Sequence, residues 1–140
     1  MHGRIAPAVA RLLALPESER VLGVYHLSRP LGRGGFAPVW LAREVYGDTE
    51  LRTVAIKLFA LDEGNTRPGM GTMGSTIAAR HKRDVIVAEA RALCQVEHPN
   101  VVRFFAIATD ASGDVLGLAM ELVQGTPLDA RLDERTKLCA

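Results

Sequence analysis

The chain has 140 residues, of which 48% are hydrophobic and 24% are charged, as expected for a folded domain that buries one sizeable core. Its formal net charge is only +1 and its basic residues form no cluster, so the composition argues against nucleic acid or an anionic membrane as a partner.

The two cysteines, Cys94 and Cys139, lie far apart in the sequence and outside any cluster of metal-ligand residues. We therefore predict a reduced, cytoplasmic protein without a metal site. Arginine strongly outnumbers lysine and alanine is abundant, a bias that weakly indicates a bacterial source with a GC-rich genome.

The N-terminal residues 5–15 are mostly apolar, but Pro7 and Arg11 interrupt the run and no run of 18 apolar residues follows. The pattern predicts a short amphipathic helix and then a linker near Pro16, so residues 1–21 are expected to form an N-terminal extension. A cleaved targeting peptide is the alternative interpretation.

Closely spaced glycines occur in LGRGGFAPVW, residues 31–40. Apolar and polar residues alternate on both sides, over residues 24–31 and 38–46, which predicts two strands joined by a hairpin. Pro38 argues against the helix that follows a dinucleotide-binding glycine motif, and a Walker loop would need a lysine earlier than Lys57. A phosphate-binding hairpin and a bulged hairpin without a ligand both remain open at this point.

The next predicted strand, residues 52–59, places Ala55, Lys57 and Phe59 on one face and three aliphatic residues on the other. A lysine among small and apolar neighbours favours an anionic partner. The alternative is a lysine whose stem packs on the sheet while its ammonium reaches water.

A helix is predicted over residues 83–96 because apolar residues recur there at helical spacing: Val85, Ala88, Ala92, Leu93 and Val96. Glu89 falls inside this stripe, where a carboxylate would need a partner, although most helix glutamates are solvated. His98, followed by Pro99 and Asn100, indicates a turn whose imidazole caps backbone groups.

Two more strands are predicted over residues 101–109 and 114–123, with a hairpin loop between them. Thr126, Pro127 and Asp129 then form a helix-start signal. The predicted fold is α+β: a five-stranded antiparallel sheet, one packed helix, a short N-terminal helix and the start of a further helix.

These motifs occur in the order of a known family. Over residues 24–132 the chain resembles the N-terminal lobe of a eukaryotic-type (Hanks-type) serine/threonine protein kinase, through the glycine hairpin, VAIK at 54–57, the helix glutamate, HPNVV and MELVQG. The resemblance implies that Lys57 holds the phosphates of ATP and that Glu89 pairs with Lys57, within about 4 Å. It also implies an ATP site made of Leu31, Gly32, Arg33, Gly34, Gly35, Phe36, Ala37, Val39, Ala55, Lys57, Met120, Glu121, Leu122 and Val123.

The chain departs from the family pattern in three ways. Ala37 replaces the last glycine of the hairpin, which a strand-like backbone should tolerate. Residues 62–80 form a Gly/Thr/Met-rich insert, expected to be a mobile loop within a lobe that spans residues 22–140. Finally, no stretch of the 140 residues matches the His-Arg-Asp catalytic loop or Asp-Phe-Gly.

The third departure predicts a piece of a kinase that is inactive alone: a truncated gene product, a deliberately made fragment or a partial gene model. Mg²⁺ and the protein substrate would then be bound only in a full-length parent. Self-association is expected if an apolar surface is left uncovered. The alternative function is a non-catalytic, kinase-like regulatory or partner-binding module.

Overall fold

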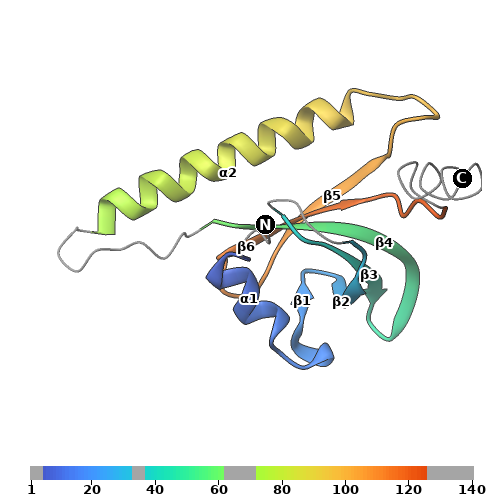
Figure 1. Cartoon of the computed structure of the whole chain (residues 1–140), viewed down its shortest axis with the longest axis horizontal. Helices are drawn as coiled ribbons and strands as arrows, with labels where there is room; N and C mark the ends of the chain where they lie inside the picture. Colours follow the sequence, from blue (N-terminus) through green and yellow to red (C-terminus); the bar gives the residue numbers. More distant parts are fainter. Residues whose placement is uncertain (1–4, 33–36, 62–71, 126–140) are drawn as a thin grey trace, which may run out of the picture.

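The computed structural model describes residues 5–32, 37–61 and 72–125, and only the backbone of residues 72–80. Figure 1 shows a strongly curled sheet with a long helix across it. The elements in chain order are α1 (Pro7–Leu13), the 3₁₀ helix η1 (Glu17–Glu19), β1 (Val21–Leu22), β2 (Tyr25–Pro30), β3 (Val39–Tyr46), β4 (Thr49–Ala60), α2 (Thr72–Cys94), β5 (Phe104–Thr109) and β6 (Val115–Met120).

The sheet has six strands in the order β1-β2-β3-β4-β6-β5, and all neighbouring strands are antiparallel. The five predicted strands are present, and β1 is an additional two-residue strand. The sheet curls until its two edges meet, because Leu22 of β1 forms an antiparallel bridge with Asp110, the residue after β5. The curl encloses an inner face and leaves an outer face for α2 (Figure 1).

Strand β4 shows how the sequence sets these two faces. Val54, Ile56 and Leu58 are fully buried in the core on the inner face. Lys57 and Phe59 alternate with them, and Phe59 packs instead in the second core, beneath α2. The predicted two-residue alternation of this strand is therefore confirmed.

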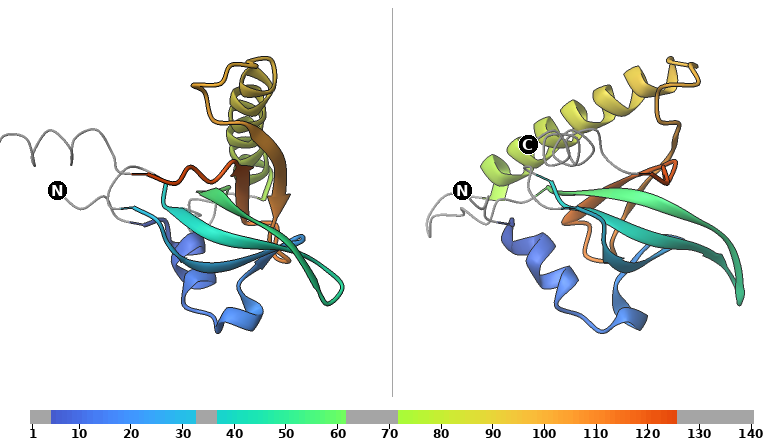
Figure 2. Two further views of the ribbon diagram at one scale, coloured as in Figure 1. Left: turned by 90° about the vertical axis from the view of Figure 1, so that its right-hand side faces the viewer. Right: turned by 45° about the vertical axis from the view of Figure 1, so that its right-hand side comes forward.

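The N-terminal segment is part of the inner core. Ala8, Val9 and Leu12 of α1 are buried in the same cluster as the inner face of β4. Figure 2 shows α1 and α2 on opposite sides of the sheet. Within the described part of the chain, no helix combines the length and the apolar character needed to cross a membrane.

Helix α2 differs from its prediction in length and in orientation. It begins at Thr72, so residues 72–80 of the segment expected to be a loop are helical, consistent with the helix-forming residues 78–80. Within residues 81–94 of this helix, Ile86 and Ala90 are buried, and they pack on Leu116 and Leu118 of β6.

The apolar stripe predicted for this helix is wrong. Val85 is 55% exposed and Val96 is 46% exposed, whereas the helix turns Ile86 and Ala90 to the sheet. Aliphatic residues occur on both sides of α2, so the periodicity alone allowed two registers, and packing selected the other one. The predicted helix start at Thr126, Pro127 and Asp129 lies outside the described residues, as do residues 62–71 of the insert.

Candidate functional site

Four of the predicted site residues come together on the outer face of the sheet. Lys57 of β4 pairs with Val39 of β3 on one side and with Leu118 of β6 on the other. Ala55, two residues earlier on the same face, pairs with Met120. Ala55 is buried, while Val39, Lys57 and Met120 are half-buried. This part of the sheet is a largely apolar surface that contains one cation.

The ammonium group of Lys57 has no carboxylate partner within 4.0 Å among the described residues. Its Nζ lies 5.5 Å from the centre of the Phe59 ring, a weak cation–π contact within one strand. The positive charge is therefore not neutralised by the residues described here, and an anion can approach it.

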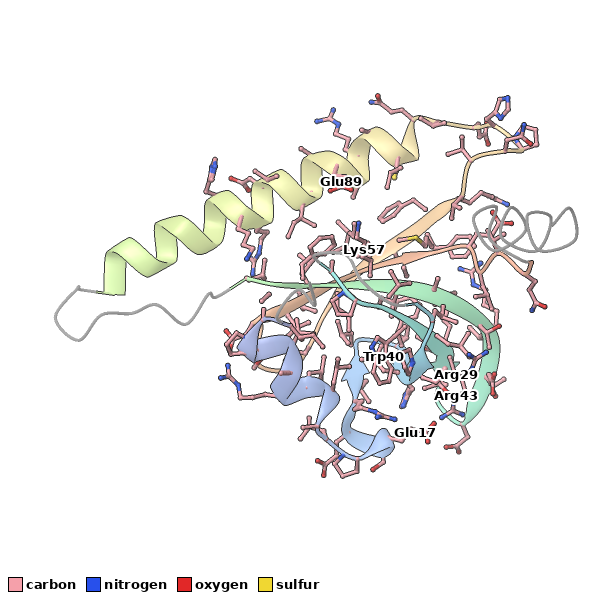
Figure 3. The ribbon with its side chains drawn as sticks, viewed as in Figure 1. Glu17, Arg29, Trp40, Arg43, Lys57 and Glu89 are labelled. Carbon is pink, nitrogen blue, oxygen red and sulfur yellow. The ribbon has the colours of Figure 1, made fainter. Side chains whose placement is uncertain are left out.

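The expected ion pair between Glu89 and Lys57 is not formed in this structure. No contact within 4.0 Å joins their charged groups, and Glu89 is exposed. Glu89 lies three residues after Ile86, so its carboxylate is at the border of the buried helix face and water can solvate it. In Figure 3, Lys57 projects from β4 toward α2, and Glu89 lies on the side of α2 that is turned to the sheet.

The glycine hairpin is closed at its base by a hydrogen bond from the Leu31 N–H to the Val39 carbonyl, 2.8 Å long. Gly32 has no described atom within 4 Å of the position that a Cβ would take, and its φ is outside the left-handed region. Neither packing nor backbone geometry among the described residues requires a glycine there. Arg33, Gly34, Gly35 and Phe36 lie outside the described residues.

Ala37, the residue in place of the last hairpin glycine, is buried with 6% of its surface exposed. No non-glycine residue in the described part of the chain has a positive φ, so Ala37 needs no backbone conformation that only glycine adopts easily. The substitution is compatible with the strand that follows it.

The segment after β6 has main-chain groups without a hydrogen-bond partner among the described residues. The Glu121 N–H donates to the Arg103 carbonyl at 2.8 Å, and the Arg103 N–H donates to the Glu121 carboxylate at 3.3 Å. The main chain of Leu122 and Val123 forms no hydrogen bond with any described residue. Donors and acceptors at the end of β6 are thus available to a planar ligand that rests on Ala55.

Two contributions to this site were not predicted from the sequence. Arg103 fixes the segment after β6, and Leu118, which is buried in the core beneath α2, pairs with Lys57. No local sequence motif marks Arg103, because its hydrogen-bond partner Glu121 is 18 residues away. Leu118 was predicted only as a strand residue, since its face depends on the register of β6 with β4.

Residues 25–140 match the family model described as protein tyrosine and serine/threonine kinase. The chain belongs to this protein kinase family. The match covers every described element of the kinase lobe from β2 onward, including the glycine hairpin, Lys57, α2 and the segment after β6. The curled antiparallel sheet with one packed helix agrees with the predicted kinase N-lobe.

Curated kinases are similar to this chain over most of its length. CBL-interacting protein kinase 4 of Oryza sativa subsp. japonica is 39% identical over 115 residues, which is 81% of this chain and 21% of the relative. Serine/threonine-protein kinase pkn2 of Myxococcus xanthus is 39% identical over 113 residues, or 81% of this chain and 11% of the relative. Serine/threonine-protein kinase ATG1a of Arabidopsis thaliana is 32% identical over 123 residues, which is 87% of this chain and 16% of the relative. The chain therefore spans less than a quarter of each of these relatives.

Proposed function

We propose that this chain is the ATP-binding lobe of a serine/threonine protein kinase. The observation that carries the proposal is the half-buried cation of Lys57, without a described acidic partner, on the same outer face as Ala55 and Val39. The space that the described residues leave at Gly32 supports it, because a bound phosphate could approach the backbone there without meeting any of their side chains.

The described residues fit an adenine nucleotide. Val39 and Ala55 offer apolar contact to one face of the base, and Met120 borders it at the end of β6. The free main-chain groups of Leu122 and Val123 can bind the polar edge of the base. Lys57 holds the phosphates by charge. The nucleotide supplies the transferable γ-phosphoryl group.

We infer that Glu89 pairs with Lys57 when α2 moves toward β4. The two side chains lie in facing elements in Figure 3, and the pair would hold the ammonium in place for the phosphates. Because Glu89 is solvated in the present arrangement, it pays no desolvation cost until that movement occurs.

Phosphoryl transfer to protein Ser or Thr is proposed for a longer protein that contains this lobe. Several of the similar proteins are named as serine/threonine-protein kinases. The catalytic base and the Mg²⁺ ligands would come from motifs that do not occur in these 140 residues, and no cluster of His, Cys, Asp or Glu in the described residues could hold a metal ion. We therefore expect the 140-residue chain alone to transfer no phosphate. A bacterial source stays a prediction, since the relatives include plant, bacterial and mammalian proteins. A cytoplasmic location and self-association also stay predictions.

The proposal is tested by titrating the 140-residue chain into a fluorescent ATP analogue and following anisotropy. The wild-type chain is expected to bind, and Lys57→Met is expected to weaken binding about tenfold or more, because a charge-assisted contact to phosphate is lost. Arg83→Met removes one positive charge from an exposed position of α2 and serves as the control, with unchanged affinity. Equal binding by wild type and Lys57→Met, or no binding by the wild type, would refute the proposal.

A further inference from the structure

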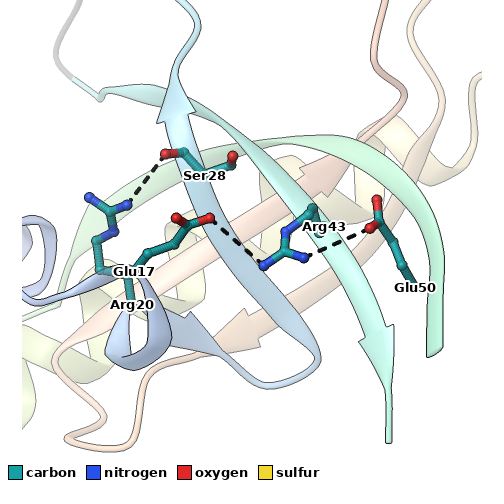
Figure 4. Close-up of polar contacts among 5 residues, drawn as sticks. All are labelled: Glu17, Arg20, Ser28, Arg43 and Glu50. Atoms are coloured by element: carbon teal, nitrogen blue, oxygen red, sulfur yellow. Dashed lines mark hydrogen bonds and ion pairs between the residues drawn. The ribbon is translucent and has the colours of Figure 1, made fainter. Parts of the chain in front are cut away.

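Arg20 joins the N-terminal segment to the two strands that carry the glycine hairpin. It lies between η1 and β1, and its main-chain carbonyl accepts a hydrogen bond from the Leu27 N–H at 2.9 Å. Its side chain extends along the sheet to Ser28 of β2, as Figure 4 shows. Arg20 therefore contacts β2 through both its main chain and its side chain.

The guanidinium group of Arg20 occupies an irregular point of the sheet. The pairing of β2 with β3 shifts register between Leu27 and Arg29, so Ser28 lies in a bulge. One terminal nitrogen of Arg20 donates to the Ser28 carbonyl in a long hydrogen bond of 3.4 Å. The guanidinium carbon lies 5.2 Å from the centre of the Trp40 ring, within the range of a cation–π contact. One side chain thus contacts β2 at its bulge and β3 at its second residue.

Hydrogen bonds alone do not explain where the Arg20 side chain lies. Its Nε is buried, and it is the one buried side-chain nitrogen or oxygen in the described residues without a hydrogen-bond partner. Buried donors without acceptors are uncommon in folded proteins and call for a specific reason. Here the contact with the indole face keeps the arginine head in place despite the unmet donor.

Trp40 and Ser28 lie directly below the hairpin. Trp40 pairs with Pro30, and the next step along the two strands is the hydrogen bond from the Leu31 N–H to the Val39 carbonyl that closes the hairpin. Trp40 packs against the inner core, whereas the adjacent Val39 pairs with Lys57 on the outer face. A shift of Trp40 would therefore shift Val39 and the base of the hairpin relative to Lys57.

A second link between the N-terminal segment and β3 is weaker. Arg43 of β3 lies 3.8 Å from Glu17 of η1 and 3.8 Å from Glu50 of β4, and all three side chains are partly exposed (Figures 3 and 4). Exposed pairs at this distance contribute little. Of these two side-chain links, that of Arg20 is the more buried and the one that reaches both β2 and β3.

We propose that Arg20 is a positioning residue for the nucleotide site, which acts from the inner side of the sheet by fixing the Ser28 bulge and Trp40. Only the effect of Arg20 on nucleotide affinity rests on the proposed function; its effect on the sheet does not. Docking of the N-terminal segment then determines how firmly Leu31 and Val39 are held together at the base of the hairpin, and so how tightly the site holds a nucleotide.

The test compares wild type, Arg20→Met, Arg20→Lys and the control Arg29→Met in the 140-residue chain. Arg29 lies one residue after the bulge, is exposed, and has no described hydrogen-bond or ion-pair partner. Amide exchange by NMR reports the Leu31 N–H, with the Leu118 N–H of β6 as a reference for the core. Acrylamide quenching reports Trp40, the one tryptophan of the chain.

Arg20→Met is expected to speed exchange at Leu31 about three- to tenfold, to increase quenching of Trp40 and to leave Leu118 unchanged. Affinity for the fluorescent ATP analogue should fall by a similar factor. Arg20→Lys keeps the charge but loses the planar fork, so Leu31 exchange should still rise, by a smaller factor. Arg29→Met should leave exchange and quenching at wild-type values.

Wild-type exchange at Leu31 in Arg20→Met would overturn the proposal, as would equal acceleration at Leu31 and Leu118, which would indicate a general loss of stability. If Arg20→Met does not fold, the Leu31 and Leu118 amides of Arg20→Lys decide in the same way. Failure of the wild-type chain to bind the nucleotide would refute the proposed function instead, because exchange and quenching are measured without nucleotide.

Discussion

At Gly32 the described residues leave room for a side chain, although the residue there is a glycine. No described atom lies within 4 Å of the place where its Cβ would be, and its φ is one that any residue adopts. Gly47, in the turn between β3 and β4, differs because its φ of +62° is in the left-handed region. The backbone conformation therefore favours a glycine at position 47, whereas nothing among the described residues requires one at position 32.

We predict that Gly32→Ala keeps or slightly raises the free energy of unfolding, by about 0.4–1 kcal/mol, because alanine restricts the unfolded chain. Its nucleotide affinity should fall severalfold, since the new methyl group occupies the space the phosphates approach. Gly47→Ala should do the opposite, losing about 1–2 kcal/mol of stability with unchanged affinity. Urea unfolding and the anisotropy titration measure the two effects. A Gly32→Ala chain that binds the nucleotide like the wild type would contradict the prediction.

Among the strands, β6 packs closely against the inner core at Gly117. A Cβ built on Gly117 would lie 2.6 Å from Cδ1 of Ile56, 2.9 Å from its Cγ1 and 3.0 Å from Cδ2 of Leu22. Ile56 and Leu22 are fully buried, so neither can move aside without disturbing the core. The absence of a side chain at Gly117 lets β4 and β6 pack against β1.

Gly117→Ala is expected to lower the free energy of unfolding by about 1–3 kcal/mol through overpacking. Ile56→Val alone should cost about 0.5–1.5 kcal/mol. In the double variant the Cδ1 that meets the new methyl group is gone, so the combined loss should be smaller than the sum of the two single losses. Urea unfolding of the four chains gives the coupling. Strict additivity would show that Ile56 is not the group in conflict.

The elements also show how far the sequence could predict the structure. In β4 the alternation identified the face of Lys57 correctly, because a period of two leaves only two choices and the aliphatic residues mark the buried one. In α2 the same approach failed, since Val85 and Ile86 are adjacent aliphatic residues on different faces and only contact with Leu116 decides between them. No periodicity in the sequence predicts the contact of Arg20 with Trp40, because the two residues belong to different parts of the chain.

Tyr25 makes the stability of the whole molecule depend on pH in the alkaline range. Tyr25 lies in the inner core with 3% of its surface exposed. Burial raises the pKa of its hydroxyl, the charge of Glu44 raises it further, and Arg52 lowers it in part. The neutral form is thus favoured in the folded chain. The resulting stabilisation is complete below the unfolded pKa of about 10 and is lost as the pH rises through the higher folded pKa, because the unfolded chain releases its proton first.

We therefore predict that the urea midpoint of the wild-type chain falls more steeply between about pH 9 and pH 11 than that of Tyr25→Phe. The variant has no hydroxyl to ionise at this position, while the other groups of the chain titrate equally in both proteins. Parallel pH profiles for the two chains would show that Tyr25 does not contribute to alkaline unfolding.

The closure of the sheet was not predictable from local patterns. A strand of two residues is too short to give an alternation, and the bridge joins Leu22 to Asp110, far apart in the sequence. The sequence predicted the short helix α1, but nothing in it indicated that Val9 and Leu12 complete the core of the sheet. Both features depend on contacts between the beginning and the end of the lobe.

The bridge between Leu22 and Asp110 also has a consequence for the order of folding. During synthesis β1, β2, β3 and β4 can form successive hairpins as they emerge, but the bridge of β1 must wait until Asp110 has been made. Closing so long a loop carries an entropic cost before any contact compensates it, which makes closure slow compared with the hairpins. Until then Leu22, which in the folded chain lies against Gly117 of β6, lacks this later neighbour on the nascent chain. This is a surface that a chaperone could cover.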